Sequence, residues 1–222
     1  MTPRFIKISS PQPLVKYLAD TIGTHLRAGE RVLWEVSGGS AVAVEVEVAA
    51  ALGGTPLEHL TVTLTDERPG PVGHPDSNWF QLARAGFKLP GARLLPVLTG
   101  SDIAADTAAF ADVLAHELAA GGYHLGLFGI GPDGHTAGLP AQNAPDHVEL
   151  AAYYEAGDFR RISSTPAAIA RLDEAVVYAV GESKHPQLER LSQQLPYTEQ
   201  SAQALKQAPS LAIFNDYKGE TL

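Results

Sequence analysis

The chain has 222 residues, of which 45% are hydrophobic and 18% are charged, and this balance is typical of a globular protein rather than a disordered one. Its 16 Lys and Arg residues stand against 25 Asp and Glu residues, giving a net charge of −9 that argues against binding to nucleic acid or to an anionic membrane surface. The sequence contains no cysteine, which excludes disulfides and thiolate chemistry.

Neither a leader segment nor a membrane span is expected. No apolar core of sufficient length follows Arg4 and Lys7, and Glu45 and Glu47 interrupt the longest apolar region. We therefore expect a cytoplasmic protein, and the sequence demands no more than a monomer or a weak homo-oligomer. Because it contains neither a linker nor an internal repeat, residues 1–222 are expected to form one domain.

Short apolar segments alternate with longer amphipathic ones along the first half of the chain. The patterns predict strands over residues 4–9, 31–37, 60–65 and 94–98, and helices over 13–27, 78–87 and 103–120. Asp76 or Ser77 is expected to cap the helix that begins at 78. A further helix is predicted from Gly38-Gly39 to about residue 52. Its pattern is ambiguous, because the valines between 42 and 48 alternate as in a strand, but a glycine pair and a run of alanines favour a strand–turn–helix.

The second half continues the alternation. Strands are predicted over 124–130, 161–165, 175–180 and 211–215, and helices over 166–172 and 183–195. Residues 140–158 contain no Lys or Arg and are expected to be irregular. Strands that alternate with helices form right-handed crossovers, so the sequence predicts a three-layer α/β/α fold: a Rossmann-like, mainly parallel sheet with helices on both faces.

Ligands of such sheets bind beyond the carboxyl ends of the strands, and three segments expected there carry unusual residues. The first is Ser37-Gly38-Gly39-Ser40. Backbone N–H groups at a glycine-rich helix start bind anions, and the serine hydroxyls add donors. The same residues also suit a tight turn with a capping serine, and they match neither a Walker loop nor a dinucleotide fingerprint.

The second segment is Thr65-Asp66-Glu67-Arg68, which is followed by His74-Pro75-Asp76-Ser77-Asn78. An arginine can hold a phosphate group through two hydrogen bonds, with the acids orienting it or a substrate hydroxyl. The alternative is a solvated ion pair on the surface.

The third segment runs from Gly129 to Ala137 and includes Asp133 and His135. Histidine is the usual general base near neutral pH, and a neighbouring carboxylate fixes its tautomer. An exposed glycine turn is the alternative. A metal site built from Asp66, Asp133 and His135 lacks any known ligand spacing, so no metal is expected.

Two further positions supply positive charge. Arg160 and Arg161 precede a predicted strand, and Lys184 follows Gly181-Glu182-Ser183 at a helix start. Each is a candidate ligand of an anion, and each also suits a plain surface cation.

In combination these segments resemble the 6-phosphogluconolactonase family, within the wider glucosamine-6-phosphate isomerase/deaminase superfamily. The resemblance is carried, in order, by the Ser-Gly-Gly-Ser, Thr-Asp-Glu-Arg, His-Pro-Asp-Ser-Asn and Gly-Ile-Gly-Pro-Asp-Gly-His-Thr-Ala segments, by Arg161-Ile162-Ser163 and by Gly181-Glu182-Ser183-Lys184. It spans most of the chain, although no single motif suffices.

The resemblance implies hydrolysis of 6-phosphoglucono-1,5-lactone to 6-phosphogluconate in the pentose phosphate pathway, without a metal or other cofactor. It implies that His135 activates the attacking water, that Asp133 orients this histidine or contacts the sugar, and that Arg68 binds the phosphate or the developing oxyanion. The resemblance also implies a phosphate and sugar pocket formed by Ser37, Gly38, Gly39, Ser40, Arg161 and Lys184, supported by Asp66 and Asn78.

The sequence departs from the family pattern in two places. Ala41-Val42 stands where the family often has Thr-Pro, and Ala137-Gly138-Leu139-Pro140 is shorter by a phenylalanine than the usual Ala-Ser-Leu-Phe-Pro-Gly. Residues 140–158 are therefore expected to form a reduced or more open wall of the site.

Three other functions stay open. An amino-sugar phosphate deaminase or isomerase on the same scaffold is disfavoured by Pro140, which stands where the deaminases have a glutamate, and by Arg68, where they have an aromatic residue. A non-catalytic sugar-phosphate sensor need not keep Asp133 and His135 together. An unrelated α/β binding protein requires all the motif matches to be accidental.

Overall fold

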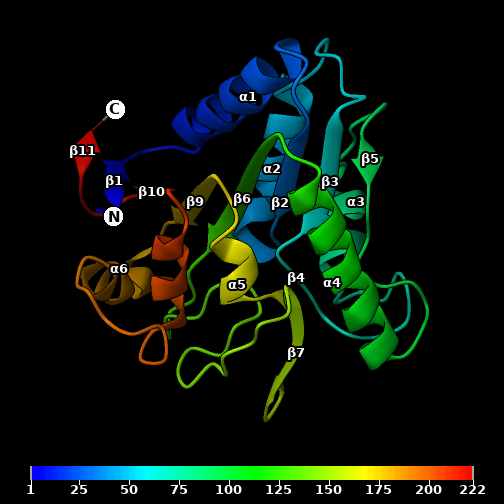
Figure 1. The fold of residues 1–222 in the computed structure, drawn as a ribbon. Helices are drawn as coiled ribbons and strands as arrows, with labels where there is room; N and C mark the ends of the chain where they lie inside the picture. Colours follow the sequence, from blue (N-terminus) through cyan, green and yellow to red (C-terminus); the bar gives the residue numbers. More distant parts are fainter. Residues whose placement is uncertain (1, 222) are drawn as a thin grey trace.

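Eight strands form the central sheet of the computed structural model, which describes residues 2–221 (Figure 1). Every pair of neighbouring strands in this sheet runs parallel. In spatial order the strands are β11 (Glu220–Thr221), β1 (Arg4–Lys7), β10 (Ser210–Asn215), β9 (Glu174–Ala179), β6 (Tyr123–Gly129), β2 (Val32–Val36), β3 (Leu60–Leu64) and β5 (Arg93–Leu94).

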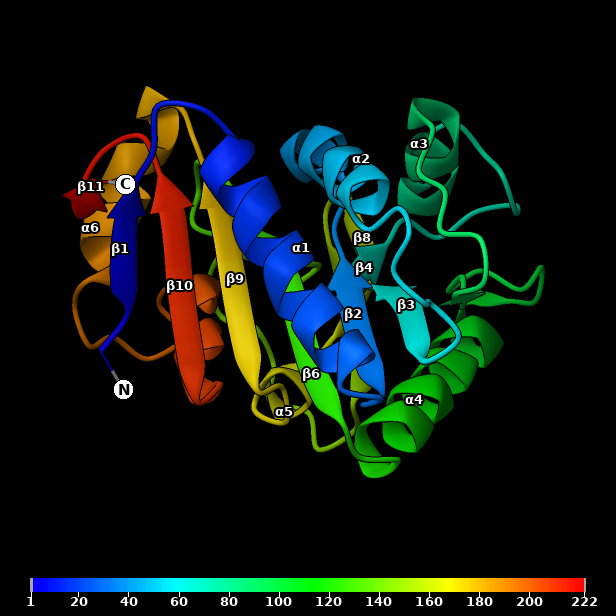
Figure 2. The ribbon, with the colours of Figure 1, turned by 90° about the horizontal axis from the view of Figure 1, so that it is seen from above.

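Helices cover both faces of the sheet, as predicted (Figures 1 and 2). The helices are α1 (Gln12–Arg27), α2 (Val42–Ala51), α3 (Asn78–Ala85), α4 (Ile103–Ala119), α5 (Pro166–Ile169) and α6 (His185–Leu191), with the 3-10 helices η1 (Gly39–Ala41), η2 (Glu182–Lys184) and η3 (Ser201–Gln207). Figure 2 shows α1 and α2 in front of the strands and α5 and α6 behind them. The fold is therefore the expected three-layer α/β/α arrangement.

The core lies on both sides of the sheet because central strands of a parallel sheet are buried on both faces. One apolar cluster is centred on Trp34 and the α1 leucines, and a second contains Phe128 and Leu188. All five residues of β2 and of β3 are buried. Such rigid strands hold the loops at their carboxyl ends in fixed positions.

A second, antiparallel sheet interrupts the region that was expected to be irregular. Within residues 140–158 the chain forms β7 (Ala151–Ala156), which pairs with β8 (Phe159–Ser164) as a hairpin. The short strand β4 (Asp66–Glu67) pairs with β8 on its other side. The prediction that this wall is irregular was thus wrong over β7. The strand forms because β8 pairs with it, and the composition of residues 140–158 alone does not indicate that pairing.

The strand predicted over residues 94–98 was also wrong. Only Arg93 and Leu94 pair with β3, and they do so at the exposed edge of the sheet. Pro96 lacks the N–H group that a continuing strand would use, while Val97 and Leu98 are buried in the core from a segment without regular structure. The apolar pattern of residues 94–98 thus predicted the burial of Val97 and Leu98 correctly, but it predicted a strand where the chain has no regular structure.

Several ends differ from expectation. The helix predicted over 183–195 divides into η2 and α6 and ends at Leu191, the one over 166–172 ends at Ile169, and η3 was not anticipated. The ambiguous valine-rich segment is helical, as expected. Ser77 is the cap of α3, since its Oγ accepts a hydrogen bond from the Phe80 N–H at 3.1 Å. No helix within residues 2–221 has the length and apolar character needed to cross a membrane.

Candidate functional site

A cavity of about 230 Å³ opens beyond the carboxyl ends of β2, β3 and β6. Ten of the eleven residues proposed from the sequence line it, namely Ser37, Gly38, Gly39, Ser40, Asp66, Arg68, Asn78, His135, Arg161 and Lys184. The eleventh, Asp133, lies behind His135. The remaining lining residues belong to the Gly129–Ala137 segment identified in the sequence, where none of them was given a role of its own: Gly129, Ile130, Gly131, Pro132 and Ala137.

The Ser37–Ser40 turn links β2 to η1 and α2. Gly39 has a φ of +66°, a conformation that favours glycine. Gly38 lies so close to α3 that an added Cβ would stand 2.0 Å from Asn78 Oδ1. From the other side Lys184 Nζ approaches Ser40 Oγ at 3.4 Å. The first N–H groups of a helix have no partner within it, so this turn presents backbone donors beside a lysine.

Ser37 itself donates inward. Its N–H donates to Glu45 Oε1 at 2.6 Å, and its hydroxyl donates to the Leu127 carbonyl oxygen at 2.6 Å. The Ser37 Oγ also lies 2.9 Å from Thr65 Oγ1. Ser37 therefore shapes the cavity wall, and the donors available to an anion come from the residues that follow it.

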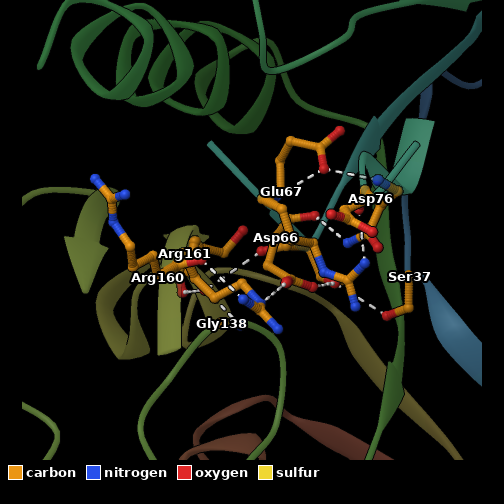
Figure 3. A network of polar contacts seen from close by, with 12 residues as sticks. Ser37, Asp66, Glu67, Asp76, Gly138, Arg160 and Arg161 are labelled. Atoms are coloured by element: carbon orange, nitrogen blue, oxygen red, sulfur yellow. Dashed lines mark hydrogen bonds and ion pairs between the residues drawn. The ribbon is translucent and has the colours of Figure 1, made fainter. Parts of the chain in front are cut away.

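Asp66 and Arg161 form the centre of the polar network in Figure 3. The small sheet brings them together, because Asp66 pairs with Ser163 in the β4–β8 register, and Arg161 Nε lies 3.5 Å from Asp66 Oδ2. Burial raises the pKa of Asp66, and the charges of Arg161 and Arg68 oppose this only in part. Arg160, by contrast, turns away from this network (Figure 3). Its Nε donates to the Tyr153 hydroxyl at 2.8 Å.

Burial also lowers the pKa of two cations of the cavity, Arg161 and Lys184. The pKa of Arg161 is lowered by burial, against the opposing charge of Asp66. The pKa of Lys184 is likewise lowered by burial, against Asp216. A cation that has lost part of its hydration gains more from a bound anion than a surface cation does.

Glu67 organises the adjoining loop. Its buried carboxylate accepts hydrogen bonds from the N–H groups of Arg68, Asn78 and Trp79 and from the Ser77 hydroxyl. These contacts fix the start of α3, from which Asn78 Nδ2 donates to the Asp66 carbonyl oxygen at 2.8 Å. Sequence reasoning grouped Glu67 with Asp66 as acids that orient Arg68, and it did not single out this role.

Arg68 lies along the cavity with one nitrogen engaged, since its Nη1 donates to the Asp76 carbonyl oxygen at 2.7 Å. Its Nε is buried and has no hydrogen-bond partner within residues 2–221. Buried donors without partners are uncommon in proteins. Arg68 therefore retains hydrogen-bonding capacity at the cavity.

His135 and Asp133 form a close pair on the loop after β6. Nδ1 of His135 lies 2.6 Å from Asp133 Oδ1, which also accepts the His135 backbone N–H at 3.2 Å. Burial alone would raise the pKa of Asp133, but the hydrogen bonds and charge of His135 outweigh it, so that the pKa is lowered. An ionised Asp133 only accepts, so Nδ1 of His135 donates to it, and in the neutral form of the imidazole the lone pair is on Nε2.

The histidine loop fits closely against its neighbours. A Cβ on Gly131 would stand 2.2 Å from the His135 ring, and one on Gly138 would stand 2.6 Å from the Cβ of Arg161. Behind the loop, Gln187 Nε2 donates to the Pro132 carbonyl oxygen at 3.0 Å, and Gln200 Nε2 donates to Gln187 Oε1 at 3.1 Å. No motif in the sequence signalled these glutamines.

Lys184 is positioned by a turn anchored to the end of β10. Asp216 accepts the Gly181 N–H at 3.0 Å and lies 3.0 Å from His185 Nε2, on either side of the lysine. Gly181 has a φ of +113°, which explains the glycine at this position. Across residues 2–221, no three His, Asp or Glu side chains come together as a metal-binding group.

Comparison with known proteins gives the family. The family model described as glucosamine-6-phosphate isomerases/6-phosphogluconolactonase matches residues 9–217. The chain is 38% identical over 128 residues to a glucosamine-6-phosphate deaminase of Beutenbergia cavernae, covering 54% of the chain and 48% of that protein. It is 29% identical over 192 residues to the GDH/6PGL endoplasmic bifunctional protein of Homo sapiens, covering 78% of the chain and 24% of that protein. The chain thus spans about half the length of the first relative and about a quarter of the second.

The fold is shared with solved structures. The crystal structure of a 6-phosphogluconolactonase from Shewanella baltica OS155 superposes with a TM-score of 0.81 at 20% identity, covering 96% of this chain and 97% of that one. The resemblance inferred from the sequence motifs is confirmed, and because the family model spans nearly the whole sequence, this chain belongs to the glucosamine-6-phosphate isomerase/6-phosphogluconolactonase family.

Proposed function

We propose that the chain hydrolyses 6-phosphoglucono-1,5-lactone to 6-phosphogluconate, with residues 1–222 acting as one domain and without a cofactor. The observation that carries the proposal is the placement of the His135–Asp133 pair at the same small cavity as three cations, Arg68, Arg161 and Lys184. In a protein with a net charge of −9, these cations provide a local site for a phosphorylated, neutral-ring substrate.

His135 is proposed as the general base. Asp133 holds Nδ1, which leaves Nε2 to take a proton from a water molecule as that water attacks the lactone carbonyl. The tetrahedral intermediate then collapses, the bond from the carbonyl carbon to the ring oxygen breaks, and the ring oxygen takes the proton back from His135. A lactone is an activated ester, so a positioned base suffices without a covalent nucleophile.

The substrate's charges are assigned to two parts of the cavity. The phosphate lies at the Ser37–Ser40 turn with Lys184, where backbone N–H groups and a partly desolvated ammonium converge. Arg68 and Arg161 lie towards the small sheet, where they stabilise the oxyanion or the sugar hydroxyls, with Asp66 and Asn78 in support. A phosphate anchored at one end orients the lactone for attack at the other.

The second candidate is deamination or isomerisation of an amino-sugar phosphate, which the 38% identity to a deaminase favours. Two residues weigh against it. Arg68 lines the cavity where the deaminases have an aromatic residue, and Pro140, which has no acid–base group, stands where they have a glutamate. A non-catalytic sugar-phosphate sensor would not require the Asp133–His135 pair.

The test is acid release from 6-phosphogluconolactone, measured as the excess over its spontaneous opening, with the unphosphorylated lactone in parallel. We expect a large excess that is confined to the phosphorylated lactone, and we expect His135→Ala to remove about 10²-fold or more of it. His116→Ala serves as the control, because that side chain is 70% exposed on α4. Ammonia release from glucosamine 6-phosphate without lactone hydrolysis would favour the second candidate, and phosphate-ester binding without either reaction would favour the sensor.

A further inference from the structure

Glu45, in the first turn of α2, is a fully buried acid that contacts the proposed phosphate turn from within the protein. Its exposed fraction is 0%, and its Oε1 accepts the Ser37 N–H at 2.6 Å. Its Oε2 is buried without a hydrogen-bond partner among residues 2–221. The sequence analysis treated this glutamate only as an interruption of an apolar region.

The contact fixes the point at which β2 becomes the turn. Ser37 is held by three elements at once, since Glu45 binds its N–H, Leu127 of β6 binds its hydroxyl, and Thr65 lies against the same hydroxyl. Gly38 and Gly39, which follow, lack a Cβ and have no comparable restraint of their own. The orientation of their N–H groups therefore depends on how firmly Ser37 is held.

Glu45 also lies close to other charged groups. Burial raises its pKa well above the ordinary value, the hydrogen bond from the Ser37 N–H opposes this in part, and the negative charge of Asp66 adds to the increase. The charges of Arg161, Arg68 and His135 oppose that of Asp66, the charge of Glu67 adds to it, and Lys184 reaches Ser40. An ionised Glu45 would put an uncompensated negative charge directly beneath a site for an anion.

We propose that Glu45 is a positioning residue of the anion site: its buried carboxyl accepts the Ser37 N–H and so fixes the turn that receives phosphate. This inference rests on the proposed function only in assigning a phosphate group to the Ser37–Ser40 turn. It requires binding of the anion and makes no use of turnover.

The experiment compares the wild type with Glu45→Gln, Glu45→Leu and Glu47→Gln. Glu45→Gln keeps an oxygen that can accept the Ser37 N–H and cannot ionise, whereas Glu45→Leu removes the acceptor. Glu47→Gln is the control, because Glu47 lies two residues further along α2 and accepts a hydrogen bond from exposed Gln12. Binding of 6-phosphogluconate and of inorganic phosphate is titrated from pH 6 to pH 9, and the Ser37 amide resonance is followed by NMR without ligand. Circular dichroism verifies that each variant is folded.

Glu45→Leu is expected to shift the Ser37 amide resonance and to weaken binding about tenfold at every pH. Glu45→Gln, which keeps an acceptor for the Ser37 N–H, is expected to bind like the wild type. Glu47→Gln is expected to follow the wild type throughout. Wild-type binding and an unmoved Ser37 amide in folded Glu45→Leu would overturn the inference, as would a loss of binding in Glu45→Gln equal to that in Glu45→Leu.

These outcomes separate the inference from the proposed reaction. Phosphate binding with the expected dependence on Glu45, but without lactone hydrolysis, upholds the inference and refutes the proposed activity. Lactone hydrolysis together with phosphate binding that is unchanged in the Glu45 variants upholds the activity and refutes the inference. An unmoved Ser37 amide in Glu45→Leu refutes the inference even in the absence of any ligand.

Discussion

Replacing Glu35 with Gln is expected to remove a loss of stability that the wild type suffers as pH rises. Glu35 lies in the middle of β2 with an exposed fraction of 1%, and its Oε2 accepts the Ser164 hydroxyl at 2.7 Å. Burial raises its pKa from 4.5 to about 7, and the Ser164 hydrogen bond offsets this only in part. Gln keeps an acceptor for Ser164 and carries no proton to lose.

The direction of this pH dependence follows from how the folded and unfolded chains bind the Glu35 proton. Between pH 4.5 and about 7 the unfolded chain has released the Glu35 proton while the folded chain still holds it. Stability therefore falls as pH rises through this window and stays low above it. At about 1.4 kcal/mol per pH unit, the difference amounts to about 3 kcal/mol, and the full burial of the side chain leaves no solvent screening to reduce it.

Urea unfolding of the wild type and Glu35→Gln at pH 5 and pH 8 measures this difference. The stability of Glu35→Gln relative to the wild type is expected to increase by about 2.5 kcal/mol between the two pH values, because all other titrations are common to both proteins. Glu58→Gln, at an exposed site, is the control and is expected to show a constant difference. A wild-type-to-Glu35→Gln difference that stays the same at both pH values would refute the reasoning.

Three further predictions concern the cavity. Asp133→Asn is expected to lower kcat by about 10²-fold with little change in KM, since it weakens the orientation of His135 but leaves the cations in place; an unchanged kcat in steady-state assays would remove Asp133 from the mechanism. Lys184→Ala and Arg161→Ala are each expected to raise KM by about tenfold or more; unchanged KM in both would show that the phosphate pocket is misplaced. Gly138→Ala is expected to lower the free energy of unfolding by about 2 kcal/mol, because its Cβ would meet Arg161 and Ser163. Gly129→Ala, where an added Cβ meets nothing within 4 Å, is the matched control for urea unfolding, and an equal loss in both would contradict the packing argument.

The parallel sheet could be predicted because its strands are continuous apolar runs that end at glycine-rich or polar loops. The 60–65 and 124–130 segments are of this kind, and both form central strands close to the expected bounds. The valine-rich α2 was harder, because its alternation suits a strand. The helix buries Val44, Glu45 and Val48 together, a preference that depends on the surrounding layers and not on local sequence.

The cavity itself was predictable for a different reason. Except for Arg161, which begins a predicted strand, each candidate residue ends or follows a predicted strand or lies at the start of a predicted helix, and parallel strands gather such positions at one edge. What stayed hidden was the supporting network: Glu67, Glu45, Gln187 and Gln200 act through the backbone of other segments. Apart from the Arg68 N–H that Glu67 accepts, the partners named above lie 8 or more residues away in the chain, so no spacing along the sequence reveals the contact.

The hairpin of β7 and β8 offers a place to lengthen the protein. Its inner strand is tied to β4 by the Asp66–Ser163 and Glu67–Ile162 pairs, close to Arg161, whereas the tip at Gly157 and Asp158 is exposed. Insertions are tolerated where exposed tips carry few contacts. A peptide tag or a fluorescent reporter placed between Gly157 and Asp158 would therefore lengthen the hairpin without detaching Arg161 from the cavity.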